Sequence, residues 1–292
     1  MPELPEVEHV VRSLRRSIVG SRIVATEVTL PKLIAPSSSS AFNRKIKGSQ
    51  ITAINRRGKY ILIELEGPKV ATAKLRRKPG HTDLILAVHL RMTGQFLVLK
   101  PDDSLPRHAH AVFYLDDERR LVFRDQRQFG VMKLVSQSEL TETKGIRELA
   151  PEPFSEEFSL SYLREILGRS KRTLKTLLLD QTRVLGLGNI YAAEALFRAG
   201  INPFTTASAL STRRISKLHT AIRDVLRAAV SGNSARRLNL EDPNGFSYGE
   251  AFGKVWQVYE REGEPCYKCG TRIRRLTHGG RSTYWCPTCQ RR

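Results

Sequence analysis

All four cysteines of this chain lie in its C-terminal segment, as Cys266-x2-Cys269 and Cys286-x2-Cys289. Two such pairs, separated by residues 270–285, can direct four thiolates at one ion with tetrahedral geometry. A shell of four thiolates is closed and leaves no position open for catalysis. In a reducing compartment this spacing is typical of a metal site and not of disulfides. The pattern therefore predicts a small unit, residues 264–292, folded around one structural Zn²⁺ ion.

The charge of the chain is strongly unbalanced. It has 49 Lys and Arg residues against 29 Asp and Glu, which gives a net charge of +20. An excess of this size indicates a polyanionic partner, of which nucleic acid is the commonest, although ribosomal and membrane-surface proteins share it. The cysteine-rich segment 266–292 contains Arg and Lys and no acid. We therefore expect the metal to hold a basic hairpin against an anion.

The composition also limits the class of protein. With 292 residues and 40% apolar residues, the chain can bury a real core, and about two domains are expected. No apolar run approaches the length of a membrane span, and acids at positions 3, 6 and 8 are not followed by the apolar region of a signal peptide. We therefore expect an intracellular protein without a membrane partner.

Hydrophobic periodicity divides the chain into two parts. Short β-branched or alternating segments predict strands at 49–55, 60–65, 84–90, 96–99, 111–115 and 120–123. From residue 159 onward the period becomes helical, and a helix over 190–198 is expected to end at Gly200. The predicted units are a β-sandwich or barrel over 2–140, a proline-containing linker over 141–158, a helical domain over 159–263 and the zinc unit. A basic insert at 67–80 is expected to be a solvated or phosphate-facing loop.

The N-terminus offers a nucleophile. Removal of Met1 would leave the secondary amine of Pro2, and an α-amino group with a pKa of about 7.7–8 is partly neutral near pH 7.5. An apolar stripe follows at Val7, Val10, Val11 and Leu14, so we expect a helix with Glu3 and Glu6 near its N-terminus. The alternative is an ordinary start codon followed by a capped surface helix.

Four further turns could contact DNA, although each has a structural explanation. Gly186–Asn189 precedes a helix that Asn189 could cap, which would leave free amides for a phosphate. Residues 56–59 indicate a hairpin with a basic tip, which is more often solvated than functional. Met92 and Phe129 lie beside glycine turns, where core packing is the default interpretation and insertion into a base stack is the alternative.

Taken together, these segments resemble the bacterial formamidopyrimidine-DNA glycosylases and their relatives, the endonuclease VIII enzymes, over nearly the whole chain. The matching motifs, in order, are MPELPEVE (1–8), RRGKY (56–60), HLRMTG (89–94), DQRQFG (125–130), KTLLLDQ (175–181), VLGLGNIYAAEALFRAG (184–200) and GGRSTYWCPTCQ (279–290). The resemblance implies an α+β multidomain fold. It has an N-terminal β-sandwich with a catalytic N-terminal helix, a helix-two-turn-helix domain and a zinc-binding β-hairpin, with DNA between the domains.

The resemblance also implies a role for individual residues. Pro2 would be the nucleophile and Glu3 the general acid, while Lys59, Asn189 and Arg281 would hold the phosphates around the flipped nucleotide. Lys59 and Arg281 count among the expected catalytic residues. The other residues expected to contact the substrate or the DNA are Glu6, Met92, His110, Arg127, Phe129 and Lys175, of which Met92, Arg127 and Phe129 would fill the gap left by the base.

The implied activity is removal of oxidised purines from double-stranded DNA, followed by β,δ-elimination through a Pro2 iminium, by a monomer in the bacterial cytoplasm near the nucleoid. Leu4 and Phe129 favour the purine-directed branch. The alternatives are an endonuclease VIII-like enzyme for oxidised pyrimidines, a non-catalytic damage-binding homologue and a basic zinc-ribbon protein of the ribosome or transcription apparatus. The chain departs from the family at the 67–80 insert and at Ser231–Ser234, where relatives often have a glycine-threonine run.

Overall fold

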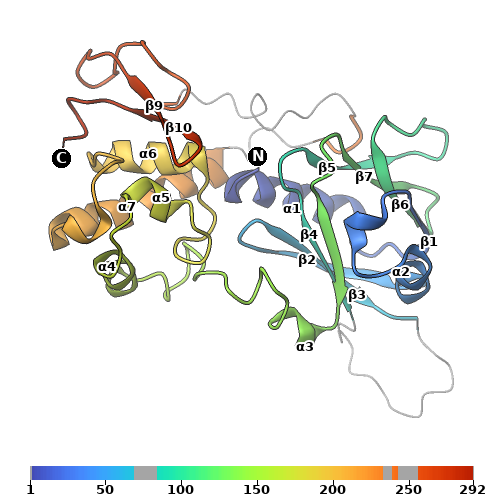
Figure 1. Cartoon of the computed structure of the whole chain (residues 1–292). Coiled ribbons are helices and arrows are strands. Elements are labelled where there is room, and N and C mark those ends of the chain that lie inside the picture. Colours follow the sequence, from blue (N-terminus) through green and yellow to red (C-terminus); the bar gives the residue numbers. More distant parts are fainter. Residues whose placement is uncertain (1, 69–83, 233–238, 243–255, 292) are drawn as a thin grey trace. The chain divides into compact units, whose positions relative to one another are not determined.

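A computed structural model describes residues 2–68, 84–232, 239–242 and 256–291 (Figure 1). Most of the basic insert 67–80 and the second half of Ser231–Ser234 lie outside the described residues. The chain divides into two compact units. We call them the N-terminal unit (Met1–Pro2, Glu6–Arg147 and Ser234–Phe252) and the C-terminal unit (Glu3–Pro5, Glu148–Asn233 and Gly253–Arg292).

The N-terminal unit is a β-sandwich with a helix on it. One antiparallel sheet has the strand order β1-β6-β7-β5 and the other the order β2-β3-β4-β8. The strands are β1 (Ile23–Val28), β2 (Gln50–Arg57), β3 (Tyr60–Glu66), β4 (Leu84–His89), β5 (Gly94–Leu99), β6 (Ala109–Leu115), β7 (Arg120–Asp125) and β8 (Val131–Val135). The short helices are η1 (Pro31–Ile34), α2 (Ser39–Ile46) and α3 (Gln137–Leu140). The sandwich prediction is confirmed, whereas β1 and β8 are strands that the hydrophobic pattern missed.

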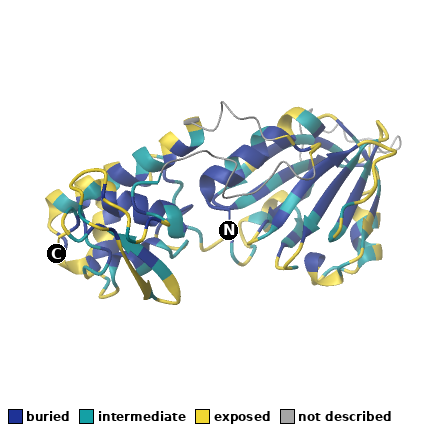
Figure 2. Ribbon diagram, turned by 90° about the horizontal axis from the view of Figure 1, so that it is seen from above, coloured by how far each residue is buried: buried dark blue, intermediate teal, exposed yellow. Residues whose placement is uncertain are grey.

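The first helix, α1 (Leu4–Ile18), contributes to the core of the sandwich. Its predicted stripe of Val7, Val10, Val11 and Leu14 is buried. In Figure 2 the ribbon next to the N label is mostly dark blue, the colour of buried residues. The stripe belongs to one core cluster with side chains from both sheets. Burying four aliphatic side chains stabilises the fold by roughly 1.5–3 kcal/mol each relative to exposure, so the start of the chain is firmly attached.

The C-terminal unit is helical and carries a two-stranded hairpin. Its elements are α4 (Leu160–Gly168), α5 (Leu174–Leu178), η2 (Ala207–Ala209), α6 (Asn189–Ala199), α7 (Thr212–Gly232), β9 (Arg274–His278) and β10 (Arg281–Trp285). Helix α6 ends at Gly200, which has a φ of 69°, as predicted for a glycine C-cap. Within the described part of the chain, no helix combines the length and the hydrophobicity needed to cross a bilayer.

Candidate active site

The carboxylate of Glu3 binds the N-terminus of α6. Its oxygens accept hydrogen bonds from the backbone amides of Gly188 (2.5 Å), Ile190 (2.8 Å) and Tyr191 (3.2 Å). The backbone of the next residue, Leu4, also donates to the carbonyl of Gly186 at 3.0 Å. Only 2% of Glu3 is exposed. Three donors at the N-terminus of the helix hold this carboxylate in one orientation.

This arrangement corrects the prediction for Gly186–Asn189. The N-cap residue of α6 is Gly188, without a side-chain cap, and Asn189 is the first helical residue. The amides that were expected to face a phosphate are occupied by Glu3. A Cβ atom on Gly188 would lie 2.4 Å from the Glu3 carboxyl carbon, so the close approach requires glycine at this position. The prediction failed because the ligand of these amides comes from the opposite end of the sequence.

Pro2 and Glu6 are both buried at the start of the N-terminal unit. Met1 lies outside the described residues, so the state of the Pro2 amine stays a prediction. Arg56 pairs with Glu8 on α1 at 2.9 Å, and this ion pair joins the helix to the β2–β3 hairpin. The N-terminal residue proposed as nucleophile is thus attached to a rigid helix.

Lys59 lies in the turn between β2 and β3 and is only 5% exposed. The expectation that residues 56–59 form a solvated tip is therefore wrong for this lysine. A buried ammonium needs compensating partners or an anion, because desolvation of a charge is costly. Burial of Lys59 favours a functional role over a solubilising one.

His89, at the end of β4, was assigned no role from the sequence. Burial, together with the charges of Arg91 and Lys59, lowers the pKa of His89 to about 3. The ring is therefore neutral at physiological pH. Its Nδ1 atom accepts a hydrogen bond from the Arg91 backbone amide at 2.9 Å, and the ring meets Tyr60 edge-on at 4.7 Å. A neutral imidazole beside Lys59 can act as a hydrogen-bonding group. The neutral state of His89 follows from its tertiary surroundings and could not be inferred from the sequence.

Buried Asp125 joins the two loops that carry Met92, Arg127 and Phe129. One carboxylate oxygen accepts from the Thr93 hydroxyl and the other from the Gly130 amide at 2.7 Å. The Thr93 hydroxyl in turn accepts from the Arg127 amide at 3.1 Å. The Asp125 carbonyl lies 3.1 Å from Nε2 of His110, so that this residue belongs to the same cluster.

The three candidate wedge residues are at the surface. Met92 is 38% exposed and Phe129 is 49% exposed, while the Arg127 guanidinium lies over the Phe129 ring at 4.9 Å from its centroid. Core packing is thus the wrong interpretation for both apolar side chains. Exposed Met and Phe on loops that Asp125 holds rigid form a preorganised apolar contact surface.

Replacement of Met92 or Phe129 by Ala should therefore change the free energy of unfolding by less than about 0.5 kcal/mol, in contrast to a core truncation. If the two side chains insert into a base stack, as the resemblance to the glycosylases implies, excision from a fully stacked lesion duplex should fall sharply. Cleavage at a preformed abasic site should fall less, because no base must be unstacked there. Thermal melts and paired assays on the two substrates test this. A large loss of stability with equal losses on both substrates would contradict it.

Lys175, on α5, anchors the β9–β10 hairpin. Its ammonium donates to the Ser282 carbonyl at 2.6 Å and to the Thr283 hydroxyl at 2.9 Å, and the residue is 1% exposed. Burial lowers the pKa of Lys175 to about 8, with a smaller contribution from the positive charge of Arg281. The negative charge of Glu3 opposes this shift. Arg281, at the start of β10, is exposed. Lys175 therefore binds the strand that presents Arg281 and does not point to solvent.

The pKa of Lys175 predicts a specific pH dependence. Between its folded value of about 8 and its ordinary value of 10.5, the unfolded chain binds a proton that the folded chain lacks. This group therefore makes stability rise with pH across that window. Lys175→Met should remove the rise, so the stability of the wild type relative to the variant should increase from pH 8 to 10.5. Denaturant titrations of both proteins at several pH values measure it; a constant difference would refute the assignment.

Asn189 has one neighbour that the sequence did not indicate. Its side chain lies near the hydroxyl of Tyr259. Burial and the neighbouring Glu260 raise the pKa of Tyr259 to about 12, and Asn189 opposes this shift. The Oδ1 atom of Asn189 is buried and has no hydrogen-bond partner among the described residues. A buried polar atom without a partner is costly, so this side chain has unused capacity for a ligand.

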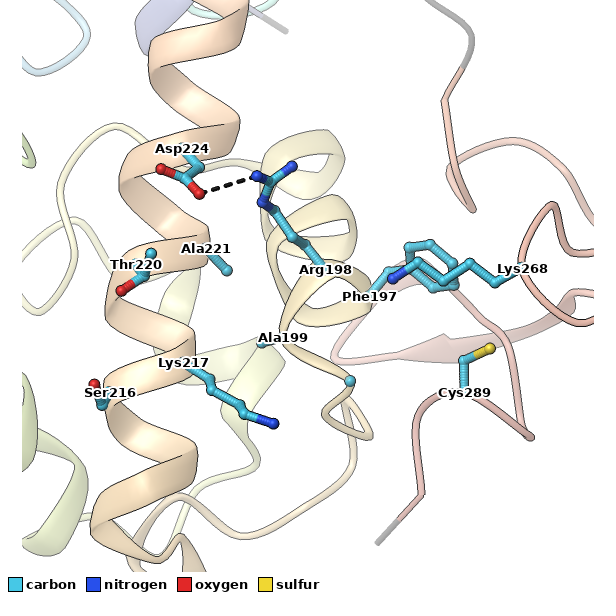
Figure 3. Close-up of a pocket in the computed structure, with 11 residues that line it drawn as sticks. Phe197, Arg198, Ala199, Ser216, Lys217, Thr220, Ala221, Asp224, Lys268 and Cys289 are labelled. Atoms are coloured by element: carbon cyan, nitrogen blue, oxygen red, sulfur yellow. Dashed lines mark hydrogen bonds and ion pairs between the residues drawn. The ribbon is translucent and has the colours of Figure 1, made fainter.

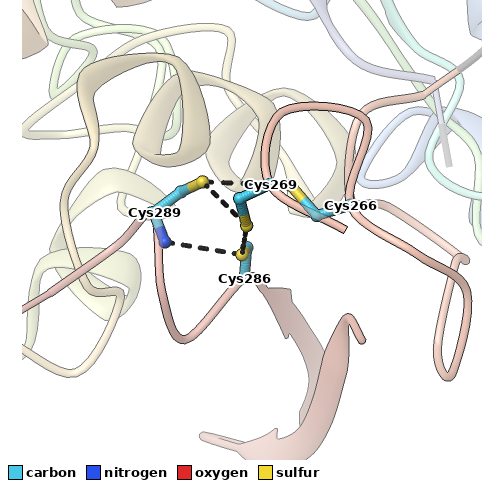
Figure 4. Close-up of side chains that lie close together, drawn as sticks. All are labelled: Cys266, Cys269, Cys286 and Cys289. Atoms are coloured by element: carbon cyan, nitrogen blue, oxygen red, sulfur yellow. Dashed lines mark hydrogen bonds between the residues drawn. The ribbon is translucent and has the colours of Figure 1, made fainter. Parts of the chain in front are cut away.

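The four cysteines converge, as predicted (Figure 4). Their sulfur atoms all lie within 4.8 Å of one another. Individual separations are 3.9 Å for Cys266 and Cys289, 3.5 Å for Cys269 and Cys286, and 3.4 Å for Cys269 and Cys289. Thiolates around a tetrahedral zinc ion lie about 3.8 Å apart, given Zn–S bonds of about 2.3 Å. The cluster is a metal-binding site of the closed, structural kind.

Comparisons with known proteins agree along the whole chain. Residues 1–132 match the family model "Formamidopyrimidine-DNA glycosylase N-terminal domain" and residues 149–239 match "Formamidopyrimidine-DNA glycosylase H2TH domain". Residues 263–292 match "Zinc finger found in FPG and IleRS". The formamidopyrimidine-DNA glycosylase of Pelotomaculum thermopropionicum is 43% identical over 100% of this chain and 99% of its own. That of Bacillus subtilis is 38% identical over 99% of each chain.

Two solved structures are similarly close. Lactococcus lactis Fpg in complex with DNA containing an abasic site has a TM-score of 0.84 and 32% identity, with 99% of this chain and 100% of that chain covered. MutM in complex with DNA containing carbocyclic 8-oxo-G has a TM-score of 0.85 and 33% identity, with both chains fully covered.

Proposed function

The chain belongs to the formamidopyrimidine-DNA glycosylase family, and we propose that it excises oxidised purines from double-stranded DNA and cleaves the strand through an iminium on Pro2. It is a DNA glycosylase and abasic-site lyase of base excision repair. The relatives crystallised with lesion-containing and abasic DNA support this substrate class. They do not favour the alternative of an endonuclease VIII-like specificity.

One observation supports the catalytic assignment above all others. The residue next to the Pro2 amine is a buried carboxylate held in one orientation by three backbone donors. A protein that only bound DNA would have no need for this arrangement beside its N-terminal amine. A positioned acid or base next to an amine of near-neutral pKa is suited to covalent catalysis.

The proposed reaction begins when the damaged nucleotide leaves the stack, at a cost of a few kcal/mol that inserted side chains offset. The neutral Pro2 nitrogen attacks C1′, and the bond from C1′ to the base breaks. The base leaves with the electron pair of that bond and takes up the proton that the Pro2 nitrogen gives up. Glu3, having gained a proton, protonates the ring oxygen, which opens the deoxyribose and yields an iminium between Pro2 and C1′. The proton is available from the ammonium form of Pro2 itself, so that one transfer produces both the nucleophile and the acid.

Strand cleavage follows from the iminium. It withdraws electrons from C1′ and so acidifies the proton on C2′; loss of that proton expels the 3′ phosphate, and a second elimination expels the 5′ phosphate. Lys59, Asn189 and Arg281 are proposed to hold these phosphates, with Glu6 and His110 near the substrate. Lys175 is proposed to contribute by positioning the strand that carries Arg281.

We further propose that the four-cysteine site holds one Zn²⁺ ion, which rigidifies the hairpin and takes no part in the chemistry. The protein is proposed to act as a monomer in the cytoplasm, at the nucleoid, because its substrate is chromosomal DNA.

Duplexes that differ in a single lesion test the proposed specificity. Double-stranded DNA carrying 8-oxoguanine should be cleaved with phosphate at both new ends, the products of β,δ-elimination, and much faster than DNA carrying thymine glycol. Faster cleavage of thymine glycol would establish the pyrimidine-directed alternative. Binding without any cleavage by protein with a free Pro2 amine would establish the non-catalytic one.

Glu3→Gln should destabilise the protein as well as slow excision. The amide would present an NH₂ group to backbone donors and leave at least one of them unsatisfied, which costs about 1–3 kcal/mol. Glu142→Gln is the matched control, because Glu142 is exposed and its ion pair with Arg147 is long, at 4.0 Å. Thermal melts compare the two variants. Equal melting temperatures would mean that Glu3 does not bind α6 in solution.

A further inference from the structure

We propose that a groove at the C-terminal end of α6 binds an acidic, partly apolar peptide segment of another protein. The groove has a volume of about 610 Å³ and is lined by the end of α6, by one face of α7 and by Lys268 and Cys289 of the cysteine-rich segment (Figure 3). All of these residues belong to the C-terminal unit. A cavity of this size is in the range that holds a small ligand or a few residues of an extended peptide.

The groove is separate from the residues assigned to the reaction. Glu3 and Asn189 lie at the N-terminus of α6, whereas Arg198 and Gly200 of the groove lie at its C-terminus. The helix has 11 residues, so that its two ends are about 16 Å apart. Neither excision nor strand cleavage, as proposed above, uses the groove.

The charge of the groove favours an anionic ligand. Arg198, Lys217 and Lys268 line it from three segments of the chain, and the last two extend toward the same space in Figure 3. Asp224, the acid among the lining residues, is already paired with Arg198 at 3.0 Å and with Arg227 at 3.6 Å. The ammonium of Lys217 therefore has no unpaired carboxylate among the lining residues to neutralise it, and the ammonium of Lys268 lies over the ring of Phe197, 4.8 Å from its centroid.

The backbone favours a peptide over a phosphate. The amides of Gly200 and Ile201 donate to the carbonyls of Phe197 and Leu196, which caps part of the end of α6. Among the described backbone groups, none donates to the carbonyls of the last two helical residues, both of which line the groove. A peptide brings N–H donors that can bind such carbonyls, whereas a nucleic-acid phosphodiester brings only acceptors.

The floor of the groove points to the same class of ligand. Of the apolar lining residues, Ala199 is partly exposed, whereas Phe197 and Ala221 are nearly buried. The hydroxyls of Ser216 and Thr220 lie one helical turn apart on α7. An apolar floor stabilises a buried aliphatic or aromatic side chain and contributes little to holding the backbone of a DNA duplex. The arrangement therefore matches a segment in which carboxylates alternate with apolar residues.

The full-length protein and a fluorescein-labelled peptide, Asp-Glu-Leu-Asp-Glu-Phe, provide the test by fluorescence anisotropy. We expect saturable binding that Lys217→Glu weakens by about tenfold or more, because a cation at the groove becomes an anion. Thr220→Trp should weaken it as well, since the larger side chain occupies the groove without changing the charge. Excision of 8-oxoguanine should be unchanged in both variants.

Arg164→Glu is the matched control, because Arg164 is exposed on α4 and does not line the groove. If this control weakens binding as much as Lys217→Glu, the peptide is held by diffuse charge and the proposal is wrong. The proposal also fails if the peptide in which Asn and Gln replace Asp and Glu binds equally well. Displacement of the peptide by an undamaged DNA duplex, with the same dependence on Lys217, would instead make the groove a second DNA site.

Discussion

Blocking the nitrogen of Pro2 should abolish the reaction with little effect on DNA affinity. A protein that retains Met1, or that carries an N-terminal tag, has an amide in place of the secondary amine and cannot form an iminium. We expect excision and strand cleavage to fall by at least about a thousandfold, the scale of loss when a nucleophile is removed from a covalent mechanism. Phosphate contacts do not involve this nitrogen, so binding to abasic duplexes should persist.

Borohydride trapping measures this effect directly. With a free Pro2 and a duplex carrying 8-oxoguanine or an abasic site, reduction should yield a protein–DNA adduct whose tryptic peptide begins at Pro2. The tagged protein should yield none. A tagged protein trapped as efficiently as the free one, or an adduct mapped to Lys59 or Lys175, would assign the nucleophile to a lysine and overturn the role proposed for Pro2.

Loss of a cysteine ligand should remove both the metal and the DNA affinity. Cys266 and Cys286 are buried among Phe197, Val258 and Ile273, so that the metal site is also the core of the small unit. Structural zinc contributes about 10–16 kcal/mol of binding free energy in isolated fingers, far more than this unit can supply by apolar burial alone. In Cys286→Ser we therefore expect zinc to be lost and the hairpin with Arg281 to become disordered.

Metal analysis and binding assays on the same preparations test this prediction. Wild-type protein should contain one equivalent of zinc, and Cys286→Ser close to none, with lesion binding and turnover falling together. Thr288→Val is the control, because it removes the hydroxyl that contacts Thr271 at 2.9 Å and keeps all four ligands. Fully active protein without zinc would show that the cysteines do not hold the hairpin through a metal.

Several features of the protein could be predicted from residues that are close in sequence. The stripe of α1, the end of α6 at Gly200 and most strands of the sandwich follow from local periodicity and turn chemistry. The convergence of the cysteines also follows, because a metal ion imposes its own geometry on ligands at a suitable spacing. Strands β1 and β8 were missed because their pairing with β6 and β4 depends on partners far along the chain.

Only the tertiary structure decided how the candidate site is held together. Glu3 binds the amides of residues 188, 190 and 191, Asp125 connects two loops, and Lys175 binds a strand beyond residue 280. Each is a buried charge whose cost is offset by partners that no local pattern specifies. The sequence alone determined which chemical groups are present and which segments form helices and strands. Folding determined which of those groups are buried, which are exposed and which partners they bind. These properties depend on contacts between segments that are remote in sequence.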